Sequence, residues 1–217
     1  MKKTLILAPH PDDDVLSFGG YIIDELAKGN AIRLIVFAVG GPCSNVDTQT
    51  RINELTNVME FLGVTDFKIY SEDTDGVLGK EIPIHNIVGF IDKEMNDYKP
   101  DCIMSCYPST HQDHLTVHEA FSASMRLRDG FMPNCVALGE YPFILPALEL
   151  PNGGKWYHPL SEETFKKKCK AFELYKSQLR PSPSPLGLDG VEVLARTRGL
   201  ECGHKYAELF YLQKIVY

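Results

Sequence analysis

The sequence has no excess of positive charge, no Cys-x-x-Cys pair and no long apolar run. Its 217 residues include 22 Lys and Arg against 29 Asp and Glu, which gives a formal net charge of −7. A broad electrostatic surface for DNA, RNA or anionic lipid is therefore not expected. Six cysteines in a chain of this length predict reduced thiols in a cytoplasmic protein rather than a disulfide framework.

The first residues begin like a secretory signal but do not continue as one. Lys2 and Lys3 precede a short apolar run that stops at Pro9, whereas a signal peptide needs about 7–15 apolar residues. Nowhere else does an apolar stretch approach the roughly 18 residues of a membrane span. We therefore expect a buried first strand over 5–8 and no transmembrane segment.

Strand patterns and helix patterns alternate along the first two thirds of the chain. Short, continuous apolar runs predict buried strands over 5–8, 31–39, 67–70, 102–106 and 136–138. Helical spacing of apolar residues covers 15–28, 51–62, 84–95 and 113–128. This alternation predicts βαβ units and an α/β, Rossmann-like fold, with a mostly parallel sheet and helices on both faces.

The pattern changes after Pro146. An edge strand is predicted over 155–158 and helices over 162–176 and 191–198, whereas 207–216 fits either a strand or a helix. The Pro/Ser segment 181–185 has three possible interpretations: a mobile lid, a solvated loop or an oligomer contact. No repeat or linker divides the chain, so we expect a single domain over 1–217, with a core in 1–145 and a C-terminal α/β extension in 146–217.

Two clusters of polar residues follow predicted strands. Residues 10–14 read His-Pro-Asp-Asp-Asp directly after the first strand. Residues 111–114 read His-Gln-Asp-His in the loop that leaves the fourth strand. Because ligands bind beyond the carboxyl ends of the strands in open parallel sheets, both clusters should open into the same crevice.

The first cluster has two interpretations. Asp12, Asp13 or Asp14 could cap the helix that follows, since Asp is common at such positions. Capping needs only one carboxylate, however, and three adjacent carboxylates repel one another. A divalent cation would neutralise this excess negative charge. With an imidazole beside the carboxylates, the residue types suit zinc, or less selectively iron or manganese.

The second cluster adds imidazoles to the same site. His111 and His114 flank Asp113, and His118 follows one helical turn later. We interpret His118 as a helix-face residue or a neighbour of the site, because an isolated histidine is more often structural than a ligand. A catalytic zinc takes three protein ligands and leaves one position for water. The two clusters meet that requirement and leave carboxylate and imidazole groups for proton transfer.

These motifs resemble those of the LmbE/PIG-L family of zinc-dependent N-acetylglucosaminyl deacetylases. The likeness rests on Ala-Pro-His-Pro-Asp-Asp over 8–13 and on His-x-Asp-His over 111–114. Further matches extend it over nearly the whole chain: Arg51-x-x-Glu54, Asp75-Gly76, Ser177-Gln178 and Tyr206-Ala207-Glu208-x-Phe210. In two positions the chain departs from the family's usual motifs, with Asp14 in place of Glu and Gln112 in place of Pro.

The resemblance implies a role for each matching residue. It implies a zinc site, with iron possible, whose ligands are His10, Asp13 and His114. Asp12 would be the general base, and His111 would polarise the amide oxygen or protonate the leaving amine. Asp113 would orient an imidazole. Arg51 and Asp75 would lie around the sugar, while a helix-surface arginine and a plain Asp-Gly turn are the alternative interpretations of these two.

The implied activity is hydrolysis of an N-acetyl group on an N-acetylglucosamine-type conjugate through a metal-activated water. The partner would be this small molecule, and the resemblance makes a homo-oligomer the expected state. One alternative is a metal-dependent phosphoryl hydrolase, although the histidines disfavour the all-oxygen shell that Mg²⁺ prefers. Others are a non-catalytic nucleotide- or metal-binding module and a metal protein that has lost its activity. The first strand lacks a following G-x-G-x-x-G, which disfavours nucleotide binding.

Overall fold

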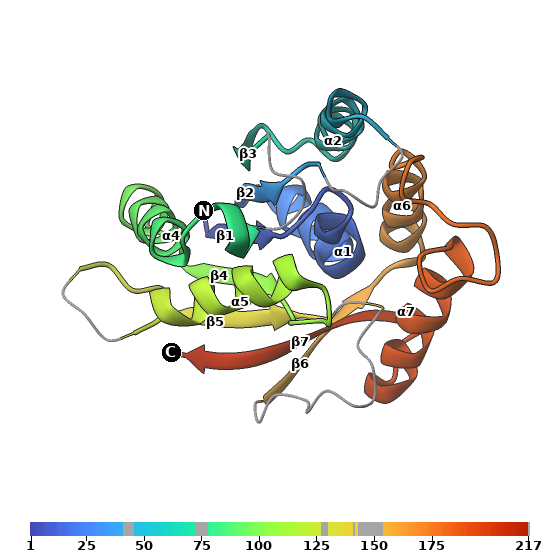
Figure 1. The fold of residues 1–217 in the computed structure, drawn as a ribbon. Helices are drawn as coiled ribbons and strands as arrows, with labels where there is room; N and C mark the ends of the chain where they lie inside the picture. Colours follow the sequence, from blue (N-terminus) through green and yellow to red (C-terminus); the bar gives the residue numbers. More distant parts are fainter. Residues whose placement is uncertain (41–45, 73–77, 127–129, 141, 143–153, 217) are drawn as a thin grey trace.

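A seven-stranded sheet forms the centre of the molecule, and helices cover both of its faces (Figure 1). The computed structural model describes residues 1–40, 46–72, 78–126, 130–140, 142 and 154–216. The strands are β1 (Lys3–Ala8), β2 (Ala31–Ala38), β3 (Asp66–Ser71), β4 (Cys102–Cys106), β5 (Cys135–Gly139), β6 (Gly154–Leu160) and β7 (Tyr206–Ile215). The helices are α1 (Asp13–Ala27), α2 (Thr48–Leu62), α3 (Leu78–Glu81), α4 (Ile84–Tyr98), α5 (Gln112–Ser124), α6 (Glu162–Glu173) and α7 (Leu188–Cys202).

The order of the strands reverses at β1. The sheet runs β3-β2-β1-β4-β5-β7-β6, and β1 to β5 pair in parallel. The chain therefore builds outward from β1 to β3, then returns to the other side of β1 to build β4 and β5. In α/β sheets, ligands bind at such a reversal, beyond the carboxyl ends of the strands.

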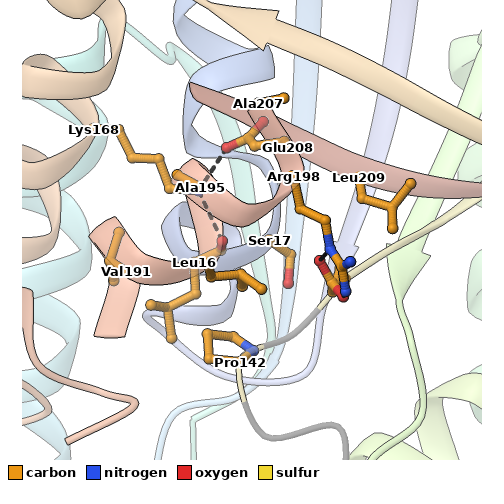
Figure 2. Close-up of a pocket in the computed structure, with 12 residues that line it drawn as sticks. Leu16, Ser17, Pro142, Lys168, Val191, Ala195, Arg198, Ala207, Glu208 and Leu209 are labelled. Carbon is orange, nitrogen blue, oxygen red and sulfur yellow. Dashed lines mark hydrogen bonds and ion pairs between the residues drawn. The ribbon is translucent and has the colours of Figure 1, made fainter. Parts of the chain in front are cut away.

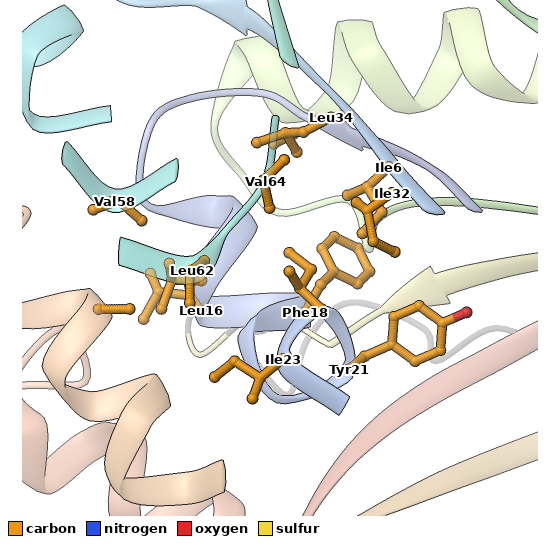
Figure 3. Packing of buried hydrophobic residues seen from close by; sticks show 14 of the residues in the cluster. Ile6, Leu16, Phe18, Tyr21, Ile23, Ile32, Leu34, Val58, Leu62 and Val64 are labelled. Atoms are coloured by element: carbon orange, nitrogen blue, oxygen red, sulfur yellow. The ribbon is translucent and has the colours of Figure 1, made fainter. Parts of the chain in front are cut away.

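Two apolar layers hold the helices against the sheet. On one face, residues of α1, α2, α6 and α7 pack against inward side chains of the strands, and Figure 3 shows part of this cluster. On the other face, α4 and α5 pack against the alternate side chains of the same strands. Because both faces are covered, β1 and β4 are buried along almost their whole length, which explains their continuous apolar runs. The predicted α/β class and the helices on both faces are confirmed.

The C-terminal extension continues this sheet. The sequence allowed a strand or a helix over 207–216, and the structure has strand β7 (Tyr206–Ile215) there, antiparallel between β5 and β6. The apolar run arises because Phe210 faces one layer while Leu209 and Tyr211 face the other. As predicted, β6 is an edge strand. The predicted helix over 191–198 is longer, and the short helix α3 was not predicted.

A buried ion pair ties the extension to α1. Lys168 Nζ of α6 donates to Glu208 Oε1 of β7 at 2.6 Å and to the Leu16 carbonyl of α1 at 2.9 Å (Figure 2). The Glu208 carboxylate also accepts from the amides of Gly20 and Tyr21, at 2.7 and 2.8 Å. Strand β7 and helix α6 therefore fix the middle of α1 directly through its backbone.

No helix in the described part of the chain is both long and apolar enough to cross a membrane.

Gly139, the last residue of β5, lies against α1 where no side chain fits. A Cβ there would lie 2.2 Å from Cε1 of Phe18, whose fully buried ring stacks on Phe210. We expect Gly139→Ala to lower the free energy of unfolding by about 1–3 kcal/mol, because the core is overpacked. Urea denaturation measures this change. Gly154→Ala is the control, because its Cβ would meet only Leu212, at 3.9 Å. Equal stability of the two variants would contradict the packing argument.

Candidate metal centre

The two polar clusters meet at the carboxyl ends of β1 and β4, which are neighbouring strands. The first cluster fills the short connection from β1 to α1, and the second precedes and begins α5. The contact between them is direct, because His10 Nε2 lies 2.9 Å from Asp113 Oδ2. The structure thus brings together, at the reversal of strand order, residues about a hundred positions apart in the sequence.

Asp12 has a strained backbone. Its φ is 112°, a value that residues other than glycine rarely adopt. The Asp12 carbonyl accepts the first helical hydrogen bonds, from the amides of Val15 and Leu16, but its side chain makes no capping hydrogen bond. Helix capping therefore does not account for the Asp12 carboxylate. Backbone strain of this kind concentrates at functional sites.

Asp13 lies between two imidazoles. Its Oδ2 is 3.5 Å from Nδ1 of His10 and 3.1 Å from Nε2 of His114. Zinc ligands at about 2.0–2.2 Å in a tetrahedron lie roughly 3.3–3.6 Å apart. The two measured spacings are close to these values, and the ligand atoms of all three residues lie within 4.8 Å of one another.

The charge of the site also fits a cation. The carboxylates of Asp12, Asp13, Asp14 and Asp113 are all at most 5% exposed. Within the described residues, Asp13 Oδ1 is buried and has no hydrogen-bond partner. A buried polar atom without a partner is costly, and a metal bound through both oxygens of Asp13 would satisfy it.

Asp113 supports His10. Its Oδ1 accepts from the Leu78 amide at 2.7 Å, and its Oδ2 contacts His10 Nε2. His10 would then bind a metal through Nδ1. A histidine that binds a metal almost always uses its other ring nitrogen to contact a carboxylate or carbonyl, which fixes the tautomer. The imidazole that Asp113 orients in the structure is therefore that of His10.

A second trio of donors, formed by His10, His111 and Asp113, also converges. Both Asp113 oxygens already have partners, whereas Asp13 keeps one oxygen available, which favours the trio with Asp13. His111 is exposed, and its Nδ1 accepts from the Asp113 amide at 3.2 Å. The neutral His111 ring therefore carries its proton on Nε2, from which it can donate a hydrogen bond.

Burial and mutual charge shift the pKa values within the cluster. Burial, together with the Asp13 charge, raises the pKa of Asp12 well above its usual range. Burial opposes the charged form of Asp13 as well, but His114 and His10 outweigh it and lower the pKa of Asp13. Burial likewise opposes a charged His10, yet Asp113 and Asp13 outweigh it and raise the pKa of His10 to about 9. The cluster therefore favours positive charge at its centre.

Arg51 is buried against the turn that carries the first cluster and does not lie on the helix surface. It is only 5% exposed, and its Nη2 donates to the Pro11 carbonyl at 3.3 Å. Its Nε is buried without a hydrogen-bond partner among the described residues. One turn along α2, Glu54 accepts from the amide and hydroxyl of Ser177 at 2.9 and 2.6 Å. Asp75, the other predicted sugar contact, lies outside the described residues.

Sequence reasoning missed Tyr175. This residue follows α6, is fully buried, and donates from its hydroxyl to Oδ1 and Oδ2 of Asp14 at 2.9 and 3.0 Å. A single buried tyrosine near the end of a helix is normally a core residue, so no local pattern distinguishes it. The Leu78 amide was missed for a similar reason. Every residue except proline has a backbone N–H, so the sequence does not show which of these groups donates to a site.

A pocket beside α1 is too small for a sugar. It lies between Leu16 and Ser17 of α1, Pro142, and Arg198 of α7, whose guanidinium pairs with Glu140 (Figure 2). Its volume of about 20 Å³ holds roughly one water molecule. The strand ends are the better candidate for the substrate site, because the possible metal ligands converge there.

Comparison with known proteins supplies a family and a fold. The PIG-L family model, described as GlcNAc-PI de-N-acetylase, matches residues 5–125. No curated protein matches the sequence.

Three solved structures share the fold. The conserved protein TT1542 from Thermus thermophilus has a TM-score of 0.80 at 21% identity, over 100% of this chain and 97% of that one. N,N'-diacetylchitobiose deacetylase from Pyrococcus horikoshii has a TM-score of 0.77 at 20% identity, over 98% and 84%. The zinc-inhibited form of teicoplanin deacetylase has a TM-score of 0.72 at 18% identity, over 97% of both chains. These likenesses show that the fold extends over the whole chain.

Removal of a ligand tests the metal site. We expect Asp13→Ala to weaken Zn²⁺ binding by more than about tenfold, because it removes the carboxylate between the two imidazoles. Competition with a chromophoric chelator measures the affinity. His118→Ala is the matched control, since His118 lies one turn beyond His114 on α5 and outside both donor trios. If both variants bind zinc as the parent does, Asp13 is not a ligand.

Proposed function

The chain belongs to the PIG-L family of GlcNAc-PI de-N-acetylases, and from this premise we propose that it is a metal-dependent N-deacetylase. Its substrate would be an N-acetylglucosamine-type conjugate. Water would add to the acetyl carbon and the amide C–N bond would break, releasing acetate and a free amine. The observation that carries this proposal is the convergence of His10, Asp13 and His114 beside a buried, strained Asp12. That two deacetylases share the fold supports the same reaction class.

The metal would be held by His10, Asp13 and His114, with Asp113 fixing the His10 ring. When bound, a divalent metal lowers the pKa of a coordinated water and polarises the carbonyl under attack. Zinc and iron(II) both accept such a donor set. Because zinc inhibits the teicoplanin deacetylase of the solved structure, both metals belong in the test.

Asp12 and His111 would move the protons. Asp12 precedes the ligand Asp13, and its carboxylate is not engaged in capping, so it would accept the proton of the attacking water. His111 holds a proton on Nε2 at the exposed mouth of the site. From Nε2 the neutral ring would donate a hydrogen bond to the amide oxygen. It would give a proton to the leaving amine only as the imidazolium, with both ring nitrogens protonated.

Arg51 would position the substrate, with Asp75 as a second proposed contact. The Arg51 guanidinium is anchored on the Pro11 carbonyl, within the turn that carries the metal ligands. Its unpartnered, buried Nε is a donor that an amino-sugar oxygen could satisfy. A phosphoryl hydrolase is disfavoured, because two imidazoles and one carboxylate are not the oxygen shell that Mg²⁺ requires.

The decisive experiment follows acetate release from a panel of N-acetylglucosamine conjugates, with zinc or iron(II) supplied. We expect Asp12→Asn to lower kcat about 10²–10⁴-fold, as for loss of a general base, while the bound metal stays stoichiometric. Hydrolysis of p-nitrophenyl phosphate in the same preparations tests the alternative reaction. No acetate from any conjugate, or full activity in Asp12→Asn, would overturn the mechanism.

A second kinetic test addresses Arg51. We expect Arg51→Met to raise KM about tenfold or more with a smaller effect on kcat, because one charged hydrogen bond to substrate is lost. Arg126→Met, at an exposed ion pair with Asp92, is the control. An unchanged KM in Arg51→Met would assign Arg51 to the structure of the turn alone.

A further inference from the structure

We propose that Tyr175 is a positioning residue that acts through Asp14 on the backbone of Asp12. In this arrangement the phenol fixes the Asp14 carboxylate, and the carboxylate fixes the Asp12 amide. Tyr175, in the C-terminal third of the sequence, thereby sets the direction of the Asp12 side chain. The inference rests on the proposed role of Asp12 and deepens it.

A continuous chain of hydrogen bonds carries the proposal. The Tyr175 hydroxyl donates to Oδ1 and Oδ2 of Asp14 at 2.9 and 3.0 Å. Asp14 Oδ1 in turn accepts from the Asp12 amide at 3.0 Å. Tyr175 and Asp14 are fully buried and Asp12 is 5% exposed, so water competes little for these bonds.

The backbone at Asp12 needs such an anchor. A φ of 112° persists in a residue with a side chain only where its surroundings impose it. The Asp12 carbonyl is held by the first turn of α1, and its amide is held by Asp14. If the amide were released, the peptide could rotate toward an ordinary conformation, and the Asp12 carboxylate would turn with it.

Packing alone does not require the Tyr175 hydroxyl. The ring belongs to the apolar layer formed by α1, α2, α6 and α7, where a phenylalanine would fill nearly the same space. Lys168, seven residues earlier, holds the Leu16 carbonyl of α1 (Figure 2). The segment from Lys168 to Tyr175 therefore contacts the first turns of α1 at two polar points, one of which leads to Asp12.

The short side chain at position 14 determines what its carboxylate can reach. Asp14 stands where the resemblance would place a glutamate, and it bonds to the amide two residues before it. A carboxylate this short stays within its own turn. The Tyr175 hydroxyl supplies the partner that links this turn to the C-terminal extension.

The test compares Tyr175→Phe with Tyr21→Phe in the full-length, metal-loaded protein. Tyr21 is the matched control, because its hydroxyl also makes a buried hydrogen bond on α1, to Thr4 Oγ1 at 2.9 Å, but away from Asp12. We expect both variants to fold, with similar small losses in Tm. In Tyr175→Phe alone, kcat should fall roughly 10- to 100-fold with KM within about twofold, as for a misdirected general base.

Hydrogen exchange of the Asp12 amide, followed by NMR, gives a second readout that needs no turnover. We expect faster exchange at Asp12 in Tyr175→Phe and parental exchange in Tyr21→Phe. Parental exchange in Tyr175→Phe, or equal acceleration in both variants, would overturn the positioning role. If the parent releases no acetate, the proposed function fails, and the exchange measurement still decides the role of Tyr175.

Discussion

The structure depends on balancing the negative charge that is buried at the carboxyl ends of its central strands. Four aspartates lie out of water around the ends of β1 and β4, with two histidines and one arginine among them. Such a group is stable only if positive charge and hydrogen-bond donors surround it. Backbone amides, the imidazoles and the arginine at these strand ends meet part of that requirement, and the proposed cation would meet the rest.

The sequence predicted the part of this site that is local. His10, Asp12 and Asp13 follow a buried strand, and His111, Asp113 and His114 follow another, so parallel pairing was sufficient to bring them together. The roles of Tyr175 and of the Leu78 amide could not be predicted, because each depends on how distant segments pack. Arg51 was ambiguous for the same reason, since only the turn at Pro11 makes it a buried residue.

The fold was predictable to a similar extent. Alternating strand and helix patterns determined the parallel part of the sheet and the two helical layers. They left 207–216 undecided, because a strand covered on both faces shows no period-two alternation. Only its place between β5 and β6 explains why nearly every side chain in its first half is buried.

The left-handed backbone at Asp12 has a consequence for how the site can change. A glycine would adopt this conformation freely but would remove the carboxylate, while any other residue needs restraint from outside its own turn. Here that restraint comes from Tyr175, 161 positions away from Asp14 and beyond the residues matched by the family model. The His-Pro-Asp-Asp motif therefore does not determine the geometry of the site by itself. If it were transferred to another parallel sheet without a residue equivalent to Tyr175, the same residue types would be present but the Asp12 backbone would not be held.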